Sequence, residues 1–359
     1  MQPQTSITSP ARSGYADVNG LHLYYEIYGS GAPLVLLHGG MLTIDLSFAS
    51  LIPALATAHQ VIGVELQGHG RTADVGRVIT PAALAGDIVA LLDHLGVERA
   101  HVFGHSMGGA VGVELAISHP RRMRSLVAAS ASVRPEGLHE DLTDAAKMAT
   151  STRMPTAQDF SDFSAAYARL SPHPEHFNDF LASLSASNTD TEGWSDELLA
   201  SISAPVLLVI GDRDFTTVEH GALMQQLIPG SQLAVLPNTT HMEVTRRHDL
   251  LLPMLARFLD LAGRSTGAAD VWRPDAAEIP RGMAKDLSTK DLSTKDRKKL
   301  SQTSFALPGK RKYPIPDKAH TRNALARVAQ HGTPAAQRKV KAAVHKRFPS
   351  IGKKKSKKS

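Results

Sequence analysis

Short apolar runs alternate with amphipathic stretches along most of the first 260 residues. Mainly apolar runs at residues 33–37, 61–66, 100–103, 125–129 and 205–210 are the right length for strands buried on both faces of a sheet. Between them, apolar residues recur at helical spacing. The clearest helix spans residues 80–96, with Thr80 as its cap, Pro81 at its first position and Gly96 as its stop. This alternation predicts a doubly wound, mostly parallel α/β sheet.

The chain is expected to begin with an antiparallel hairpin. Residues 15–18 and 21–28 have strand-like composition, and the two residues between them are Asn19 and Gly20. Both residue types tolerate a positive φ, which a two-residue hairpin turn requires. Further helices are predicted at residues 45–58, 217–227 and 249–261, and a last strand at residues 232–236.

A glycine-flanked serine joins the strand at residues 100–103 to the following helix. The sequence there is Gly104-His105-Ser106-Met107-Gly108, which is the G-x-S-x-G nucleophile elbow in its required strand–turn–helix context. Glycines are needed on both sides because the chain reverses direction with the serine strained, and Cβ atoms would not fit. The turn should therefore push the Ser106 hydroxyl out at the end of the sheet. The alternative for the motif alone is an ordinary small-residue turn.

Other loops support the functional interpretation of the elbow. His38-Gly39-Gly40 follows the strand at 33–37, Gln67-Gly68-His69-Gly70 follows the strand at 61–66, and Gly211-Asp212-Arg213-Asp214 follows the strand at 205–210. Together with the elbow, these motifs make residues 14–263 resemble the α/β-hydrolase fold superfamily. That resemblance implies that the backbone N–H groups of Gly40 and Met107 form an oxyanion hole. We interpret His38 and His69 as residues that order their loops.

Serine is a poor nucleophile at neutral pH, so Ser106 needs a base and a carboxylate that orients this base. Among 17 histidines, His241 is the candidate, because it follows the last predicted strand. The order Ser106, Asp214, His241 matches that of the α/β-hydrolase fold and neither of the two common serine-protease orders. Asp212 follows the same strand as Asp214 and competes for the acid role. The superfamily's turn pattern favours Asp214.

Strand–helix alternation stops between Ser130 and Ala204, where the superfamily inserts its cap. We therefore expect residues 131–203 to form a helical cap. Six aromatic residues are scattered through this segment, and they could either line a substrate pocket or hold short helices together. They are Phe160, Phe163, Tyr167, Phe177, Phe180 and Trp194.

Composition narrows the class of protein. A chain of 359 residues can bury one large core and carry an appendage. It has no cysteine, which excludes disulfides and thiolate chemistry. There is no apolar leader and no run of about 18 apolar residues, so we expect a cytoplasmic protein without a membrane span. Neither a metal-site pattern nor a nucleotide-binding loop occurs, and no cofactor is expected.

Charge divides the chain into two parts. Residues 1–280 contain 17 Lys and Arg against 30 Asp and Glu, whereas residues 281–359 contain 23 against 4. The predicted organisation is a flexible N-terminus at 1–13, a hydrolase domain at 14–263, a linker at 264–300 and a basic helical module at 301–359. Helices are predicted at residues 317–330 and from Pro334 onward. This module resembles one appended to various actinobacterial and phage proteins.

The sequence predicts a serine hydrolase that cleaves an ester or related carbonyl compound through an acyl-enzyme on Ser106. A cofactor-free perhydrolase or haloperoxidase would keep the same three residues and is the alternative among enzymes. Ser106 excludes the branch that uses an aspartate nucleophile. Outside catalysis, residues 297–359 could neutralise the phosphates of nucleic acid or another polyanion, or remain a solvated basic end. The oligomeric state and the size of the acyl group do not follow from the sequence.

Overall fold

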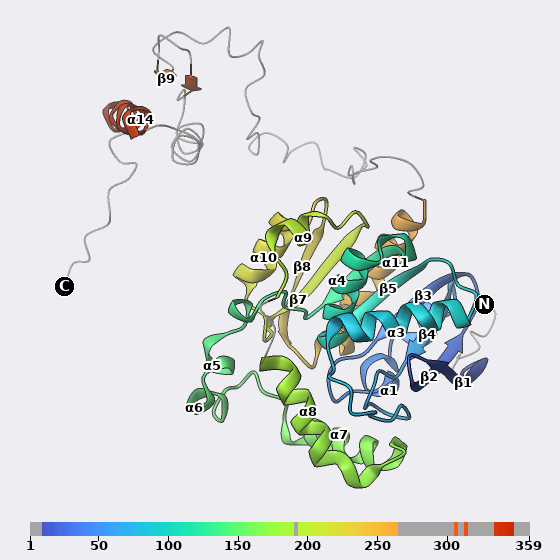
Figure 1. The fold of residues 1–359 in the computed structure, drawn as a ribbon. Helices are drawn as coiled ribbons and strands as arrows, with labels where there is room; N and C mark the ends of the chain where they lie inside the picture. The colour runs from blue at the N-terminus through green and yellow to red at the C-terminus, as the bar shows by residue number, and fades with distance from the viewer. Residues whose placement is uncertain (1–8, 190–192, 265–304, 308–311, 315–333, 348–359) are drawn as a thin grey trace. The chain divides into compact units, whose positions relative to one another are not determined.

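Eight strands form one sheet in the order β1-β2-β4-β3-β5-β6-β7-β8 (Figure 1). The computed structural model describes residues 9–189, 193–264, 305–307, 312–314 and 334–347, which belong to two units, Met1–Val271 and Trp272–Ser359. The strands of the sheet are β1 (Arg12–Val18), β2 (Leu21–Tyr28), β3 (Ala32–Leu37), β4 (His59–Val64), β5 (Ala100–His105), β6 (Met123–Ala129), β7 (Val206–Arg213) and β8 (Gln232–Thr240). All neighbours from β4 to β8 pair in parallel.

The predicted antiparallel start is confirmed. β1 pairs with β2 in antiparallel register, and β2 pairs with β4 in the same sense. Asn19 and Gly20 both have positive φ, at 50° and 81°. β1 begins at Arg12, within the range 1–13 that we expected to be flexible, and the Ala11 N–H donates to the Ile27 carbonyl at 2.8 Å. The hairpin therefore extends the sheet further toward the N-terminus than the alternation predicted.

Helices cover both faces of the sheet, as a doubly wound fold requires. Val35 and Leu37 of β3 contribute to the core beneath α3 (Pro81–His94), α4 (Met107–Ser118) and α10 (Val218–Leu227). Leu34 and Leu36 contribute to the core on the other side, with α1 (Ile44–Phe48), α2 (Ile52–Leu55) and α11 (His248–Arg264). Because successive strand side chains point to opposite faces, the wholly apolar β3 fills both cores.

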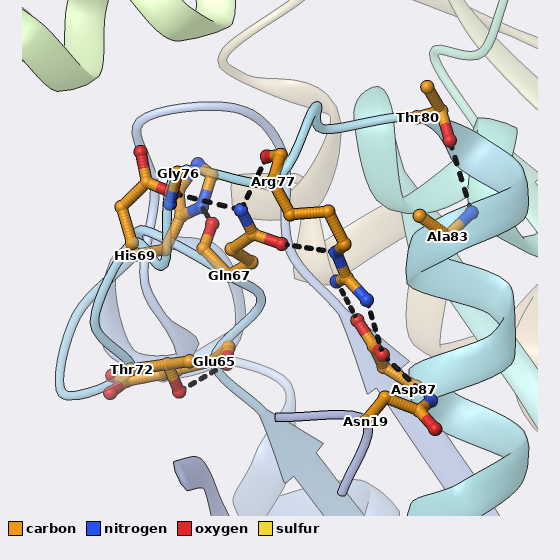
Figure 2. A network of polar contacts seen from close by, with 11 residues as sticks. Asn19, Glu65, Gln67, His69, Thr72, Gly76, Arg77, Thr80, Ala83 and Asp87 are labelled. Carbon is orange, nitrogen blue, oxygen red and sulfur yellow. Dashed lines mark hydrogen bonds and ion pairs between the residues drawn. The ribbon is translucent and has the colours of Figure 1, made fainter. Parts of the chain in front are cut away.

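The single helix predicted at residues 45–58 is wrong, since two short helices, α1 and α2, occupy this range. Pro53 lies in the first turn of α2 and has no N–H to donate, so the chain cannot continue α1 through it. By contrast, α3 starts as predicted. The Thr80 side chain accepts a hydrogen bond from the Ala83 N–H at 3.1 Å, with Pro81 at the first position (Figure 2).

A helical insertion separates β6 from β7, and we call residues 131–203 the cap. Its α-helices are α5 (Glu140–Thr143), α6 (Ala145–Met148), α7 (Ala157–Leu170), α8 (Phe177–Thr189) and α9 (Asp196–Ala200). Tyr167 stacks on Phe180 with ring centroids 5.2 Å apart, and Phe180 packs edge-on against His69 at 4.8 Å. These aromatic residues hold the cap helices together and seat them on the loop after β4, whereas Phe160 is exposed.

The second unit contains a short antiparallel pair, β9 (Phe305–Leu307) and β10 (Lys312–Pro314), and the helix α14 (Pro334–Arg347). The helix predicted to start at Pro334 is thus present, and its Val340 and Val344 are buried. The two strands were not predicted, because three-residue strands carry too little alternation to be recognised. The helix predicted at residues 317–330 lies outside the described residues. No described helix is both long and apolar enough to span a membrane.

Candidate active site

Ser106 sits in a strained turn between β5 and α4. Its φ and ψ are 54° and −116°, and its N–H donates to the Ala129 carbonyl of β6 at 2.8 Å. A Cβ atom on Gly104 would lie 2.1 Å from the Gly108 carbonyl oxygen, and one on Gly108 would lie 2.1 Å from the Leu37 carbonyl oxygen. Both glycines are therefore required by close backbone packing, which holds the serine at the carboxyl edge of the sheet.

Loops after three different strands bring Ser106, His241 and Asp214 together. His241 Nε2 lies 2.9 Å from Ser106 Oγ, and its Nδ1 lies 2.6 Å from Asp214 Oδ1. The competing Asp212 is exposed, and its Oδ1 accepts a hydrogen bond from the Thr239 N–H at 3.0 Å. Asp212 thus joins the end of β8 to β7, while Asp214 faces the histidine.

Asp214 is fully buried, with a carboxylate that accepts several hydrogen bonds. Besides His241, the donors are the Ser130 hydroxyl at 2.6 Å, the Gly211 N–H at 3.1 Å and the Phe215 N–H at 2.6 Å. Burial alone would raise the pKa of Asp214, but the charge and hydrogen bond of His241, with those donors, outweigh it and lower the pKa to about 2. Asp214 is therefore ionised at neutral pH.

Ser130 was not predicted as a site residue. It follows β6 directly and has a φ of 53°, which is rare for a residue with a Cβ atom. The sequence did contain a signal, because the other candidate groups also follow the carboxyl ends of parallel strands. Serine is common in loops, however, and no motif distinguishes this one.

The loop after β3 packs directly against the elbow. A Cβ atom on Gly39 would lie 3.2 Å from the Ser106 Cβ, whereas one on Gly40 would meet nothing within 4 Å. The Gly40 and Met107 N–H groups make no hydrogen bond to another described residue. Two backbone donors near the serine are thus available, and the space beside Gly40 is open.

Two buried histidines hold this loop. His38 Nδ1 lies 2.8 Å from the Gly39 carbonyl oxygen, and its Nε2 accepts from the Leu66 N–H at 3.1 Å. His69 Nε2 accepts from the Met41 N–H at 3.1 Å. Burial lowers the pKa of His38 well below its usual value and that of His69 to about 4. Both rings are neutral at pH 7, with Nδ1 as the donor, and they hold backbone groups in place.

The loop that carries His69 is itself held by a polar network, shown in Figure 2. Arg77 donates to Gln67 Oε1 at 2.9 Å and pairs with Asp87 of α3 through both terminal nitrogens, at 3.1 and 2.5 Å. Asn19 of the first hairpin donates to Asp87 at 3.0 Å. His69 Nδ1 donates to the Gln67 carbonyl at 2.9 Å, so the network extends to the loop after β3.

Two aromatic rings contact the candidate base. Phe215 stacks on His241 with ring centroids 3.8 Å apart and an interplanar angle of 6°. His105 Nε2 donates to the His241 carbonyl at 3.0 Å, while its buried Nδ1 has no partner among the described residues. Burial lowers the pKa of His105 to about 3, which keeps it uncharged. Neither residue was predicted to contribute to the site.

The cap is attached to the loops that carry the candidate residues. Arg246, which follows His241 in the chain, donates to Asp159 of α7 at 2.7 Å. Phe163 of α7 forms a buried apolar cluster with Leu42 and Met242. Through these contacts, α7 covers the loops after β3 and β8. In the described part of the chain, no group of three or more histidine, aspartate or glutamate side chains could hold a metal ion.

Comparisons with known proteins agree with the observed fold. A profile of the alpha/beta hydrolase fold family matches residues 32–157. A putative carbamate hydrolase RutD of Azorhizobium caulinodans is 43% identical over 126 residues, which are 34% of this chain and 46% of that protein. 3-oxoadipate enol-lactonase 1 of Acinetobacter baylyi is 28% identical over 258 residues, covering 67% of this chain and 94% of that protein.

Solved structures show the same fold. The enol-lactonase of Burkholderia xenovorans superposes with a TM-score of 0.56 at 24% identity, over 68% of this chain and 99% of that one. The sheet order, the elbow and the inserted cap define an α/β protein of the hydrolase type. The chain therefore has the α/β-hydrolase fold. Its alignment with the carbamate hydrolase spans less than half of that relative.

Proposed function

We propose that this protein is a serine hydrolase that cleaves an ester or a related carbonyl compound through an acyl-enzyme on Ser106. The observation that carries the proposal is the continuous pair of contacts from Ser106 Oγ to His241 Nε2, at 2.9 Å, and from His241 Nδ1 to Asp214 Oδ1, at 2.6 Å. Both distances are within hydrogen-bond reach for a nucleophile, its base and the group that orients the base.

In this mechanism, Ser106 Oγ attacks the substrate carbonyl carbon while its proton moves to His241 Nε2. The C–O bond to the leaving group then breaks, and His241 returns the proton to the departing alcohol. A water molecule next loses a proton to His241 and attacks the acyl carbon. The acid product leaves, and Ser106 regains its proton. Asp214, ionised and buried, stabilises the imidazolium formed in each half of the cycle.

The Gly40 and Met107 N–H groups are the proposed donors to the oxyanion. They have no partner among the described residues, and the open space beside Gly40 can admit a substrate oxygen. Donors that are fixed before the reaction stabilise the negative charge without reorganisation, by about 3 kcal/mol each in known cases. The hydrogen bonds of His38 and His69 to this part of the backbone support that rigidity.

The test compares the wild-type protein with Ser106→Ala. Labelling by a fluorophosphonate probe and turnover of p-nitrophenyl esters of increasing chain length should both be lost in the variant. We also expect kcat/KM to fall in acid, because a protonated imidazole cannot accept the Ser106 proton. Turnover retained by Ser106→Ala would contradict the proposal. The ester series also reports the acyl size that the cap admits.

A second proposed function concerns the second unit, which we propose binds polyanions such as nucleic acid. Helix α14 buries Val340 and Val344, and the four of its cationic side chains whose exposure is described are all exposed. They are Arg338, Lys339, Lys341 and Lys346. A helix with one apolar buried face and an exposed basic surface is suited to neutralising phosphates without reading sequence.

Binding of a fluorescent oligonucleotide, followed by anisotropy, tests this function in the full chain. We expect affinity to fall about tenfold or more between about 50 and 200 mM salt. The charge-reversed variant Lys339→Glu/Lys341→Glu/Lys346→Glu should lose the binding. The matched control Arg121→Glu/Arg169→Glu changes exposed cations of the hydrolase unit and should retain it. Equal, salt-insensitive anisotropy for all three proteins would contradict the proposal.

A further inference from the structure

We propose that Phe215 is a positioning residue for the proposed hydrolysis: its ring holds the imidazole of His241 and stabilises the protonated form that arises during each half-reaction. The inference rests on the proposed serine hydrolase and adds to it a residue outside the serine, histidine and aspartate. Two independent contacts support it, because Phe215 touches His241 with its side chain and Asp214 with its backbone.

The side-chain contact is a face-to-face one. The two ring centroids are 3.8 Å apart with planes inclined by 6°, so the imidazole lies flat on the phenyl face. The face of an aromatic ring carries negative potential, and a cation placed on it within about 6 Å of the centroid is stabilised. An imidazolium at this position gains that attraction, whereas a neutral imidazole gains only packing. The stack therefore favours the charged form.

The backbone of Phe215 is held on both sides, so its ring is fixed before substrate binds. The Phe215 N–H donates to Asp214 Oδ1 at 2.6 Å, and the Phe215 carbonyl accepts from the His139 N–H of the cap at 3.0 Å. The next residues continue this attachment, because Thr216 pairs with Leu138. Rotation of the imidazole away from Ser106 would break the stack, and Phe215 cannot follow without losing these bonds.

Other charged and titratable groups also surround His241. They are Asp214 from the loop after β7, His105 from β5 and Arg246 from η4 (Val244–Arg246), with Arg153 of the cap donating to the Asp214 carbonyl at 3.3 Å. His105 is uncharged because burial lowers its pKa to about 3. Substitution of Phe215 changes none of these groups. Differences between variants at position 215 therefore report on the ring.

The test measures the rate of fluorophosphonate labelling and kcat/KM against pH for the wild type, Phe215→Leu and Phe215→Tyr. Leucine keeps the apolar volume but has no aromatic face. We expect kcat/KM of Phe215→Leu to be about 3- to 30-fold lower than that of the wild type, which is the size of known cation–π contributions. The decrease should lie in kcat rather than in KM. The acid limb of its profile should move to lower pH, because the protonated imidazole loses stabilisation. Phe215→Tyr should remain close to wild type.

Two further altered proteins serve as a control and as a second test of the ring at position 215. Tyr15 stacks on His22 in the hairpin at the sheet edge, with ring centroids 4.1 Å apart and planes inclined by 8°. Tyr15→Leu therefore removes a similar aromatic–histidine stack away from the candidate site, and it should leave activity unchanged. Pentafluorophenylalanine incorporated at position 215 keeps the ring shape but reverses the sign of its face potential. If Phe215→Leu does not fold, this protein still tests the proposal, and it should reproduce the loss and the shifted acid limb.

The inference would be overturned if the acid limb of the kcat/KM profile stayed in place or moved to higher pH in both Phe215→Leu and the pentafluorophenylalanine protein. Equal activity of Phe215→Leu and the wild type would also overturn it. Such results leave the serine hydrolase intact if the wild type is labelled and Ser106→Ala is not. A wild type that resists labelling overturns the proposed function, and the inference falls with it.

Discussion

The Ser130 hydroxyl donates a 2.6 Å hydrogen bond to Asp214 Oδ2, on the oxygen opposite the one that faces His241. Ser130 lies at the carboxyl end of β6 and Asp214 follows β7, so the contact joins neighbouring strands across the candidate site. One carboxylate oxygen is thus occupied by the serine and the Gly211 N–H, while the other is left for the imidazole and the Phe215 N–H.

Removal of this hydroxyl should weaken the proposed triad. Ser130→Ala is expected to lower kcat about 10- to 150-fold, since hydrogen bonds to charged groups contribute about 1.5–3 kcal/mol. Ser130→Gly also lacks the hydroxyl but adopts the φ of 53° without strain, so it separates the lost bond from backbone effects. Steady-state kinetics on both variants measure the loss. Full activity in Ser130→Gly would contradict a role for the hydroxyl.

The same variants should be more sensitive to acid. The pKa of Asp214 is lowered to about 2 from an ordinary 3.8, so its ionised form stabilises the fold above that ordinary value, and this is lost as the pH falls through about 2. Without the Ser130 hydrogen bond, the pKa of Asp214 should rise. The acid unfolding midpoint, followed by circular dichroism, should therefore move to higher pH in both variants. An unchanged midpoint would argue that Ser130 does not stabilise the ionised carboxylate.

Asp214 and Asp212 provide a matched comparison of neighbouring carboxylates. Asp214→Asn is expected to lower kcat about 10³- to 10⁴-fold, because the amide favours the wrong histidine tautomer and cannot stabilise the imidazolium. Asp212→Asn keeps an oxygen that can accept from the Thr239 N–H, so its activity should stay near that of the wild type. Kinetics on the ester series distinguish the two. Equal losses would show that the acid role is wrongly assigned.

The sequence was sufficient to predict the elements with strong local patterns. Short apolar strands, the caps of α3 and the Asn19-Gly20 turn follow from periodicity and local backbone preference. The elbow and the order of Ser106, Asp214 and His241 follow from motif context. Ser130, Phe215 and the Arg246–Asp159 pair could not be predicted, because their contacts depend on how loops from different strands converge.

Two glycines near the site should respond differently to a methyl group. Gly108→Ala places a Cβ 2.1 Å from the Leu37 carbonyl oxygen, which is incompatible with the observed packing, and we expect at least about 2 kcal/mol of destabilisation. Gly40→Ala meets no atom within 4 Å and should leave the melting temperature unchanged. If the space beside Gly40 receives the substrate oxygen, this variant should instead lower kcat/KM. Thermal unfolding and ester kinetics test both expectations.

A buried carboxylate outside the candidate site predicts a dependence of stability on pH. Glu65 follows β4 and is fully buried, and Arg71 donates to it through its N–H at 2.6 Å and its guanidinium at 2.8 Å. Glu26 is also buried and accepts from the hydroxyls of Tyr24 and Tyr28. Burial raises the pKa of Glu65 to about 7, although Arg71 opposes this effect.

A carboxyl group with a raised pKa stabilises the fold most in its protonated form. For Glu65 this contribution is complete below the ordinary value of 4.5 and is lost as the pH rises through about 7, on the order of 3 kcal/mol in total. Glu65→Gln remains neutral and should lack this loss, so the difference in melting temperature between variant and wild type should shift in favour of the variant from pH 5 to 8. If the melting temperatures of the two proteins changed with pH in parallel, Arg71 would be keeping Glu65 ionised throughout this range. The raised pKa of Glu65 would then be wrong.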